Sequence, residues 1–117
     1  MTGDKLTWTV RARVSVDRGG AKVLGRGRVE LLRHIDHHHS IAAAAKQMGM
    51  SYRRAWSLVR DINRAAGEPL VEVTAGGPGG GGAALTARGR AALALYDRAV
   101  ARIDRATAGL KFRTPSA

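Results

Sequence analysis

Hydrophobic and polar residues follow two different periods along this chain, and the change of period separates its parts. From Leu6 to Val16 the two kinds of residue alternate strictly. A period of two predicts a strand with one buried face. The apolar positions are Leu6, Trp8, Val10, Ala12, Val14 and Val16. Such a strand needs a partner, either from this chain or from a second subunit.

After this stretch the period becomes that of a helix. The spacing of Val29, Leu32 and Ile35 predicts a helix from about Gly27 to His37. A short alanine-rich helix is expected from about Ile41, and a longer one from about Tyr52. The inward positions of the longer helix are Ala55, Leu58, Val59 and Ile62.

The residues between these two helices indicate a helix-turn-helix. Ala45 is small enough to stand where two helices cross closely. Gly49 can adopt the positive φ that ends the first helix. Ser51 can cap the second helix through its hydroxyl group.

The second half of the chain has the layout of a wing followed by a long helix. Residues Leu70–Thr74 predict a strand, and Ala83–Leu85 predict the strand that returns after a glycine-rich segment. Thr86 is a suitable cap for a helix that continues to about Leu110. Its apolar residues recur close to a heptad: Leu93, Tyr96, Val100, Ile103 and Leu110. We expect this helix to form a homodimer, which would present two recognition helices to a palindromic site.

The expected fold class is therefore mainly α with a small β component. It is a winged helix-turn-helix with an N-terminal strand and a long C-terminal dimerisation helix. The predicted divisions are an N-terminal strand and loop (1–20), the winged helix-turn-helix (21–86), the dimerisation helix (87–110) and a flexible tail (111–117).

Charge points to a partner class. A formal net charge of +11 on 117 residues favours a polyanion, with double-stranded DNA as the leading candidate. No apolar run is long enough to span a bilayer, so no membrane partner is expected. The N-terminus lacks an apolar signal region, so we expect a cytoplasmic, nucleoid-associated protein. The absence of cysteine excludes disulfides and thiolate metal sites.

The polar face of the helix from Tyr52 carries the candidate DNA contacts. Arginine on such a face can read guanine edges or bind phosphates. Trp56 borders this face and has two open interpretations, stacking on sugar or base, or packing beneath a neighbouring element. The residues expected in the groove are Tyr52, Arg53, Trp56, Ser57 and Arg60, and those expected at phosphates are Ser40, Lys46, Ser51 and Arg54.

Two further clusters are weaker candidates for a binding site. The wing glycines either make the segment mobile or bring backbone amides to phosphates; they are Gly76, Gly77, Gly79, Gly80, Gly81 and Gly82. No Lys-Ser or Lys-Thr follows them, so this is no nucleotide P-loop. His34, His37, His38 and His39 are dense, but no fixed carboxylate or cysteine completes a metal site. We predict no metal and no cofactor.

Gly49–Asn63 (GMSYRRAWSLVRDIN) and Gly76–Thr86 (GGPGGGGAALT) together resemble the N-terminal domain of the molybdate-responsive ModE regulators. That domain is a winged helix akin to those of LysR-type regulators, and the similarity extends from the first strand to the long helix. The resemblance implies a dimeric transcription factor whose recognition helix matches Ser51–Arg60. It also implies a link to molybdate or metal homeostasis. Because the chain stops just after the long helix, molybdate sensing itself is not expected here.

The leading function is thus a sequence-specific, homodimeric transcriptional regulator. The alternatives are a small oxyanion or metal sensor, built on the glycines and histidines, and a non-specific, nucleoid-type nucleic-acid-binding protein. An enzyme is not expected, because no nucleophile and base stand at useful spacing.

Overall fold

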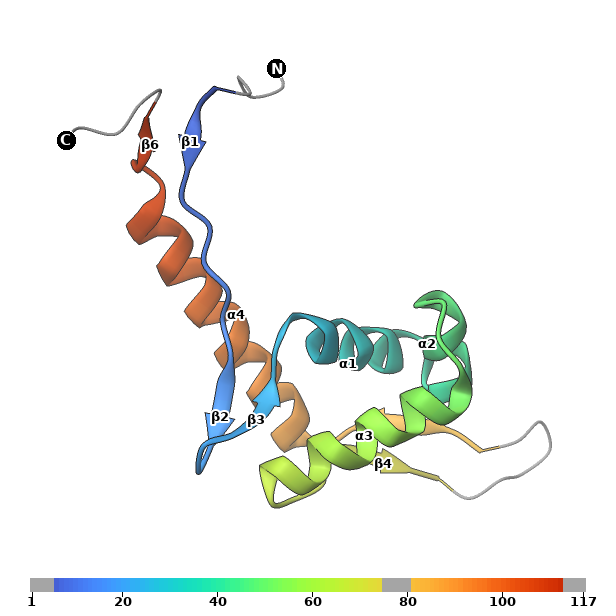
Figure 1. The fold of residues 1–117 in the computed structure, drawn as a ribbon. Helices are drawn as coiled ribbons and strands as arrows, with labels where there is room; N and C mark the ends of the chain where they lie inside the picture. The colour runs from blue at the N-terminus through green and yellow to red at the C-terminus, as the bar shows by residue number, and fades with distance from the viewer. Residues whose placement is uncertain (1–5, 75–80, 113–117) are drawn as a thin grey trace.

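The computed structural model describes residues 6–74 and 81–112, and within them the chain forms four helices and three small sheets (Figure 1). The helices are α1 (Arg26–His38), α2 (Ile41–Gln47), α3 (Tyr52–Ala66) and α4 (Ala87–Thr107). Each sheet is an antiparallel pair: β1 (Trp8–Thr9) with β6 (Lys111–Phe112), β2 (Val16–Arg18) with β3 (Ala21–Leu24), and β4 (Val71–Val73) with β5 (Ala83–Leu85). This arrangement confirms the mainly α, winged helix-turn-helix fold.

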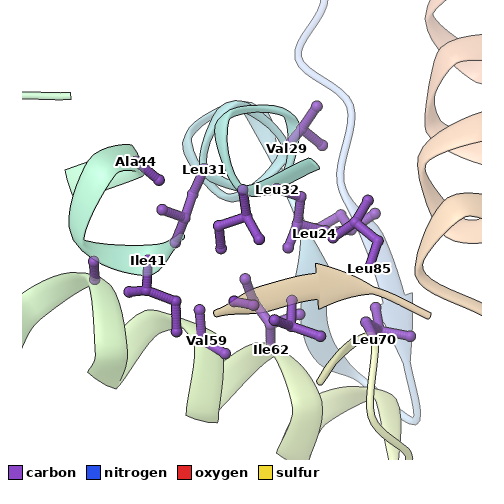
Figure 2. Packing of buried hydrophobic residues seen from close by; sticks show 14 of the residues in the cluster. Leu24, Val29, Leu31, Leu32, Ile41, Ala44, Val59, Ile62, Leu70 and Leu85 are labelled. Atoms are coloured by element: carbon purple, nitrogen blue, oxygen red, sulfur yellow. The ribbon is translucent and has the colours of Figure 1, made fainter. Parts of the chain in front are cut away.

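A single hydrophobic core joins the first three helices to the strands β3, β4 and β5 (Figure 2). Helix α1 contributes Leu31, Leu32 and Ile35, each fully buried. Helix α3 contributes Ala55, Val59 and Ile62, also fully buried, while Leu58 packs at the edge of the core. The inward stripe predicted for α3 is therefore confirmed, and it determines which face of that helix points outward.

The turn between α2 and α3 has the predicted local chemistry. Ala45 is 2% exposed, and its carbonyl accepts a 3.0 Å hydrogen bond from the Met50 N–H. Gly49 has a φ of +66°, where a side chain would be strained. The Ser51 hydroxyl accepts a 3.0 Å hydrogen bond from the Arg54 N–H and so caps α3.

Helix α4 leaves the core at the backbone of Leu70. The Thr86 hydroxyl caps α4 by accepting a 3.0 Å hydrogen bond from the Gly89 N–H, as predicted. The Thr86 N–H donates to the Leu70 carbonyl at 2.9 Å. A Cβ atom at Gly89 would lie only 2.2 Å from that carbonyl oxygen, so α4 packs against the Leu70 backbone, just before β4, at a distance that only glycine permits. Leu93 is buried in the core and Tyr96 packs at its edge, and the rest of the helix extends away from the core (Figure 1).

The prediction of one long N-terminal strand is wrong. The segment forms two short strands, β1 and β2, with no regular structure at residues 10–15 between them. The expected buried face is open in the single chain, with Leu6, Trp8 and Val10 exposed by 66%, 62% and 47%. Alternation predicts a strand, but a strand needs a neighbour, and among the described residues β1 pairs with the two-residue β6 alone. We call residues 6–15 the N-terminal arm; it runs beside α4, away from α3 (Figure 1).

The division into parts stays a prediction. In the expected tail, Lys111 and Phe112 pair with β1, and residues 113–117 lie outside the described part of the chain.

The close approach at Gly89 gives a stability test. We expect Gly89→Ala to lower the free energy of unfolding by about 1–3 kcal/mol, because the added methyl group must displace α4 from the Leu70 carbonyl. The clash should outweigh the gain of up to about 1 kcal/mol in helix propensity. Chemical denaturation measures the difference.

Gly27→Ala is the matched control. Gly27 lies in α1 with open space around the position of a Cβ atom. This variant should therefore raise the free energy of unfolding, by about 0.5 kcal/mol. Equal stabilities for the two variants would contradict close packing at Gly89.

Candidate nucleic-acid interface

The outward face of α3 is open to solvent. Because Ala55, Val59 and Ile62 are buried on one side of the helix, the side chains half a turn away must point outward. Tyr52 is 51% exposed and Trp56 39%, and the three arginines Arg53, Arg54 and Arg60 are exposed as well. Residues 6–74 and 81–112 thus leave uncovered the surface that the sequence predicts to face DNA.

The predicted residues of α3 lie together around one open depression. Its volume is about 820 Å³, and it is lined by Ser51, Tyr52, Arg53, Arg54, Trp56, Ser57 and Arg60. In residues 6–74 and 81–112, the side-chain ion pairs are Arg33 with Asp97 and Arg88 with Glu68. The arginines of the depression are thus left without a carboxylate among the described residues. An exposed, uncompensated row of guanidinium groups can bind phosphate oxygens or base edges.

Trp56 lies on the outward face and is not a member of the hydrophobic core. Its indole ring shares the depression with Arg53 and Arg60. This position gives it access to a ligand that approaches α3, which favours the stacking interpretation over packing beneath a neighbouring element.

The start of α2 lies next to the start of α3 and the base of the wing. The Ser40 hydroxyl caps α2 by accepting a 3.0 Å hydrogen bond from the Ala43 N–H. Ser40, Tyr52, Gly81 and Gly82 help to line a smaller depression of about 250 Å³. Lys46 is exposed in the last turn of α2. The structure therefore groups Ser40 with the α3 face and places Lys46 on the same helix as Ser40.

The wing is held at its base by backbone hydrogen bonds. The Thr74 N–H donates to the Gly82 carbonyl at 2.8 Å, and the Gly82 N–H donates to the Thr74 hydroxyl at 2.9 Å. The Ala83 N–H donates to the carbonyl of His39 at 3.0 Å. Gly76, Gly77, Gly79 and Gly80 lie outside the described residues, so their role as phosphate contacts stays a prediction.

In the histidine cluster, the ring of His38 contacts those of His34 and His37. The ring centroids of His34 and His38 are 5.9 Å apart, and those of His37 and His38 are 4.7 Å apart. Across the part of the chain that the structure describes, no three His, Cys, Asp or Glu side chains come close enough to hold a metal ion.

Two residues of this surface were missed by the sequence-based analysis. Arg64 is exposed on α3 and continues the spacing of Arg53, Ser57 and Arg60 at steps of four and three residues. That spacing was visible in the sequence, so the helical period could have revealed it. The other is Asn63, which ends the ModE-like motif in the sequence. In the structure its side chain connects α3 to β4.

Asn63 fixes the wing relative to α3. Its Oδ1 atom accepts hydrogen bonds from the N–H groups of Leu70 at 2.8 Å and Val71 at 3.2 Å. Its Nδ2 atom donates to the Val71 carbonyl at 3.1 Å. One amide side chain therefore mimics a neighbouring strand and sets the direction in which β4 leaves the helix.

These features define a helix-turn-helix DNA-binding domain with a wing. The family described as "Bacterial regulatory helix-turn-helix protein, lysR family" matches residues 27–90. The chain belongs to this family.

Several curated proteins are similar to this domain. The transcriptional regulator ModE of Yersinia pestis is 47% identical over 70 residues, which cover 60% of this chain and 27% of the relative. The DNA-binding transcriptional dual regulator ModE of Escherichia coli K12 is 44% identical over the same shares of each chain. The molybdenum-pterin-binding protein MopA of Rhodobacter capsulatus is 42% identical over 85 residues, covering 73% of this chain and 32% of the relative. The chain thus resembles a ModE-like DNA-binding domain and spans about a third or less of these relatives.

One negative finding concerns membranes. Among the helices in residues 6–74 and 81–112, none combines the length and apolar character that crossing a bilayer requires.

The bonds of Asn63 give a second stability test. We expect Asn63→Ala to lower the free energy of unfolding by about 1–3 kcal/mol, because half-buried backbone groups of Leu70 and Val71 lose their partners. Hydrogen exchange at the Leu70 and Val71 amides should accelerate. Asn63→Asp should retain more stability, because a carboxylate still accepts from both amides. Unchanged exchange at these two amides in Asn63→Ala would rule out the proposed link between α3 and β4.

Proposed function

We propose that this protein is a sequence-specific, DNA-binding transcriptional regulator that acts as a homodimer. The observation that carries the proposal is the outward face of α3, which is basic, exposed and free of intramolecular carboxylate partners among the described residues. Membership of a regulatory helix-turn-helix family and similarity to ModE regulators support it. A cytoplasmic, nucleoid-associated location follows from this function.

The contacts divide into two groups. Tyr52, Arg53, Trp56, Ser57 and Arg60 would enter the major groove, where a bidentate arginine distinguishes guanine from other bases. Ser40, Lys46, Ser51 and Arg54 would hold phosphates, which position the protein without reading sequence. The wing glycines would approach the backbone beside them.

The homodimer is supported by apolar surface that the single chain leaves uncovered. The N-terminal arm exposes Leu6, Trp8 and Val10, and α4 and the turn after it expose Leu95 by 47% and Leu110 by 41%. These residues lie on the part of the molecule that projects from the core (Figure 1). A second copy could cover both elements and place two α3 helices about a two-fold axis.

A link to molybdenum is part of the proposal and rests on the names of the relatives. Two of them are ModE regulators and one is a molybdenum-pterin-binding protein. Calorimetry of the purified chain with molybdate, tungstate and zinc tests whether the chain itself binds an oxyanion or a metal. Binding of any of the three would support the sensor alternative.

Selection from random-sequence duplexes tests the function directly. We expect a palindromic consensus, because two symmetry-related domains should read two half-sites. Recovery of no preferred sequence would instead support the non-specific, nucleoid-type alternative.

The role of Arg53 can be tested on the selected duplex. Arg53→Ala should weaken binding to the consensus by about 1–3 kcal/mol, or roughly five- to 150-fold, if its guanidinium makes a bidentate base contact. Binding to random duplexes should fall much less. Fluorescence anisotropy at fixed salt measures both, and equal losses on the two kinds of DNA would reduce Arg53 to a phosphate contact.

The dimer can be tested with one substitution on each side of β1. Trp8→Glu places a charge on the apolar side and should raise the dimer Kd by at least about 30-fold, as expected for a buried aromatic anchor worth about 2 kcal/mol. Thr9→Glu places the same charge on the polar side and should leave the Kd unchanged. Sedimentation equilibrium measures both. A wild-type protein that stays monomeric at micromolar concentration would contradict the dimer.

A further inference from the structure

A second basic surface lies at the C-terminal end of α3. The hairpin formed by β2 and β3 packs against this end of the helix, whereas the strands of the wing point past its N-terminal end (Figure 1). An open groove of about 590 Å³ separates the hairpin from α3. It is lined by Arg18, Gly19, Ala21, Lys22, Arg28, Asp61, Arg64 and Ala65. This surface lies outside both the depression on α3 and the wing.

 The hairpin carries more positive than negative charge, and part of its positive charge has no carboxylate partner among the described residues. Within the described residues, Arg18, Lys22 and Arg64 are exposed and form no ion pair. Asp61 is the one carboxylate in the groove, and Asp17 accepts a hydrogen bond from the Ser15 hydroxyl at 2.5 Å. The surface therefore keeps a net positive charge that an anion can neutralise.

Two internal contacts hold the hairpin in place. The Arg28 Nη1 atom donates to the Lys22 carbonyl at 2.6 Å, so Arg28 braces the backbone of the hairpin. The Arg18 guanidinium lies over Gly67, the residue that caps α3, where a Cβ atom would be 2.7 Å from Cζ. A cation at this end of a helix is stabilised by the helix dipole. Arg18 is thus oriented toward the end of the recognition helix.

The surface is also continuous with the face of α3 already described. Arg53, Arg60 and Arg64 follow one another at steps of seven and four residues, so they lie on one side of the helix. The 15 residues of α3 span about 22 Å, whereas the major groove is about 12 Å wide. A helix of this length that crosses the groove brings its two ends close to the two phosphate backbones that border it.

We propose that the β2–β3 hairpin is a second phosphate-binding element, in which Arg18 and Lys22, together with Arg64, contact the DNA backbone opposite the wing. The proposal rests on the proposed function, since it requires α3 to engage a duplex. Its partner is the phosphodiester backbone of the same DNA molecule. These contacts would add affinity and lengthen the protected site without reading sequence.

The salt dependence of DNA binding tests the hairpin. The probe is a long duplex of random sequence, and the protein is the full chain. Each phosphate contact contributes about 0.9 to the slope of log K against log salt concentration. The double variant Arg18→Ala/Lys22→Ala should therefore lower the slope by about 1.8.

The matched control removes the same charge elsewhere. Arg11→Ala/Arg13→Ala changes two exposed arginines of the N-terminal arm, which runs away from α3 (Figure 1). Its slope should equal that of the wild type. Equal reductions in both double variants would overturn the proposal, because the effect would then reflect net charge alone.

Further variants separate binding from folding. Arg18→Ala removes a side chain that lies over the end of α3, so thermal unfolding is measured in parallel. Lys22→Ala alone should lower the slope by about 0.9, and Arg18→Lys should retain the wild-type slope because the charge remains. A hairpin that only supports the fold would lower the unfolding temperature and leave the slope unchanged, which would overturn the proposal.

The results also distinguish this proposal from the function on which it rests. If the wild type binds DNA and Arg53→Ala weakens that binding, the proposed function stands. If Arg18→Ala/Lys22→Ala then showed the same salt slope as the wild type, only the proposal about the hairpin would be overturned. If the wild-type chain binds no duplex, both proposals fall.

Discussion

The backbone of Leu70 is the point at which the recognition helix, the wing and the long C-terminal helix are joined. Its N–H donates to Asn63 of α3, and its carbonyl accepts from Thr86 at the start of α4. Its side chain is 2% exposed in the core, and Gly89 allows α4 to pack directly against its carbonyl. Polar groups at such a depth are stable only when they are paired. Leu70 therefore links α3, the start of β4 and α4 through its backbone.

The same organisation separates stability from binding. The buried stripe of α3 faces α1 and the strands, and the arginines of α3 have no structural partner among the described carboxylates. Charge that is not used to hold the fold together is available for an external polyanion. By contrast, Arg33 and Arg88 pair with Asp97 and Glu68, and Arg28 braces the hairpin through the Lys22 carbonyl. The basic residues thus fall into those with an intramolecular partner and those without a carboxylate partner among the described residues.

The sequence predicted well the features that depend on local chemistry. The caps Ser51 and Thr86, the positive φ of Gly49 and the buried stripe of α3 each follow from a few neighbouring residues. The N-terminal strand failed because alternation reports the side on which residues lie, whereas a strand also needs a neighbour to pair with. Asn63 and Arg18 could not be found in this way, since their partners lie seven or more residues away or on another element. Arg64 was within reach of the helical period. The contacts with DNA stay predictions, because exposed side chains show which groups are available to a ligand and not which bases or phosphates they meet.

The carbonyl of His39 has a mechanical consequence. His39 has a φ of 54°, the only positive value at a non-glycine position in the part of the chain described, and its oxygen binds the Ala83 N–H at the root of the wing. The next residue, Ser40, caps α2. A displacement of β5 therefore reaches the beginning of the helix-turn-helix through this peptide group as well as through the core residues Ala83 and Leu85. The root of the wing and the start of α2 are thus connected by backbone, since His39 accepts from β5 and is followed directly by the cap of α2.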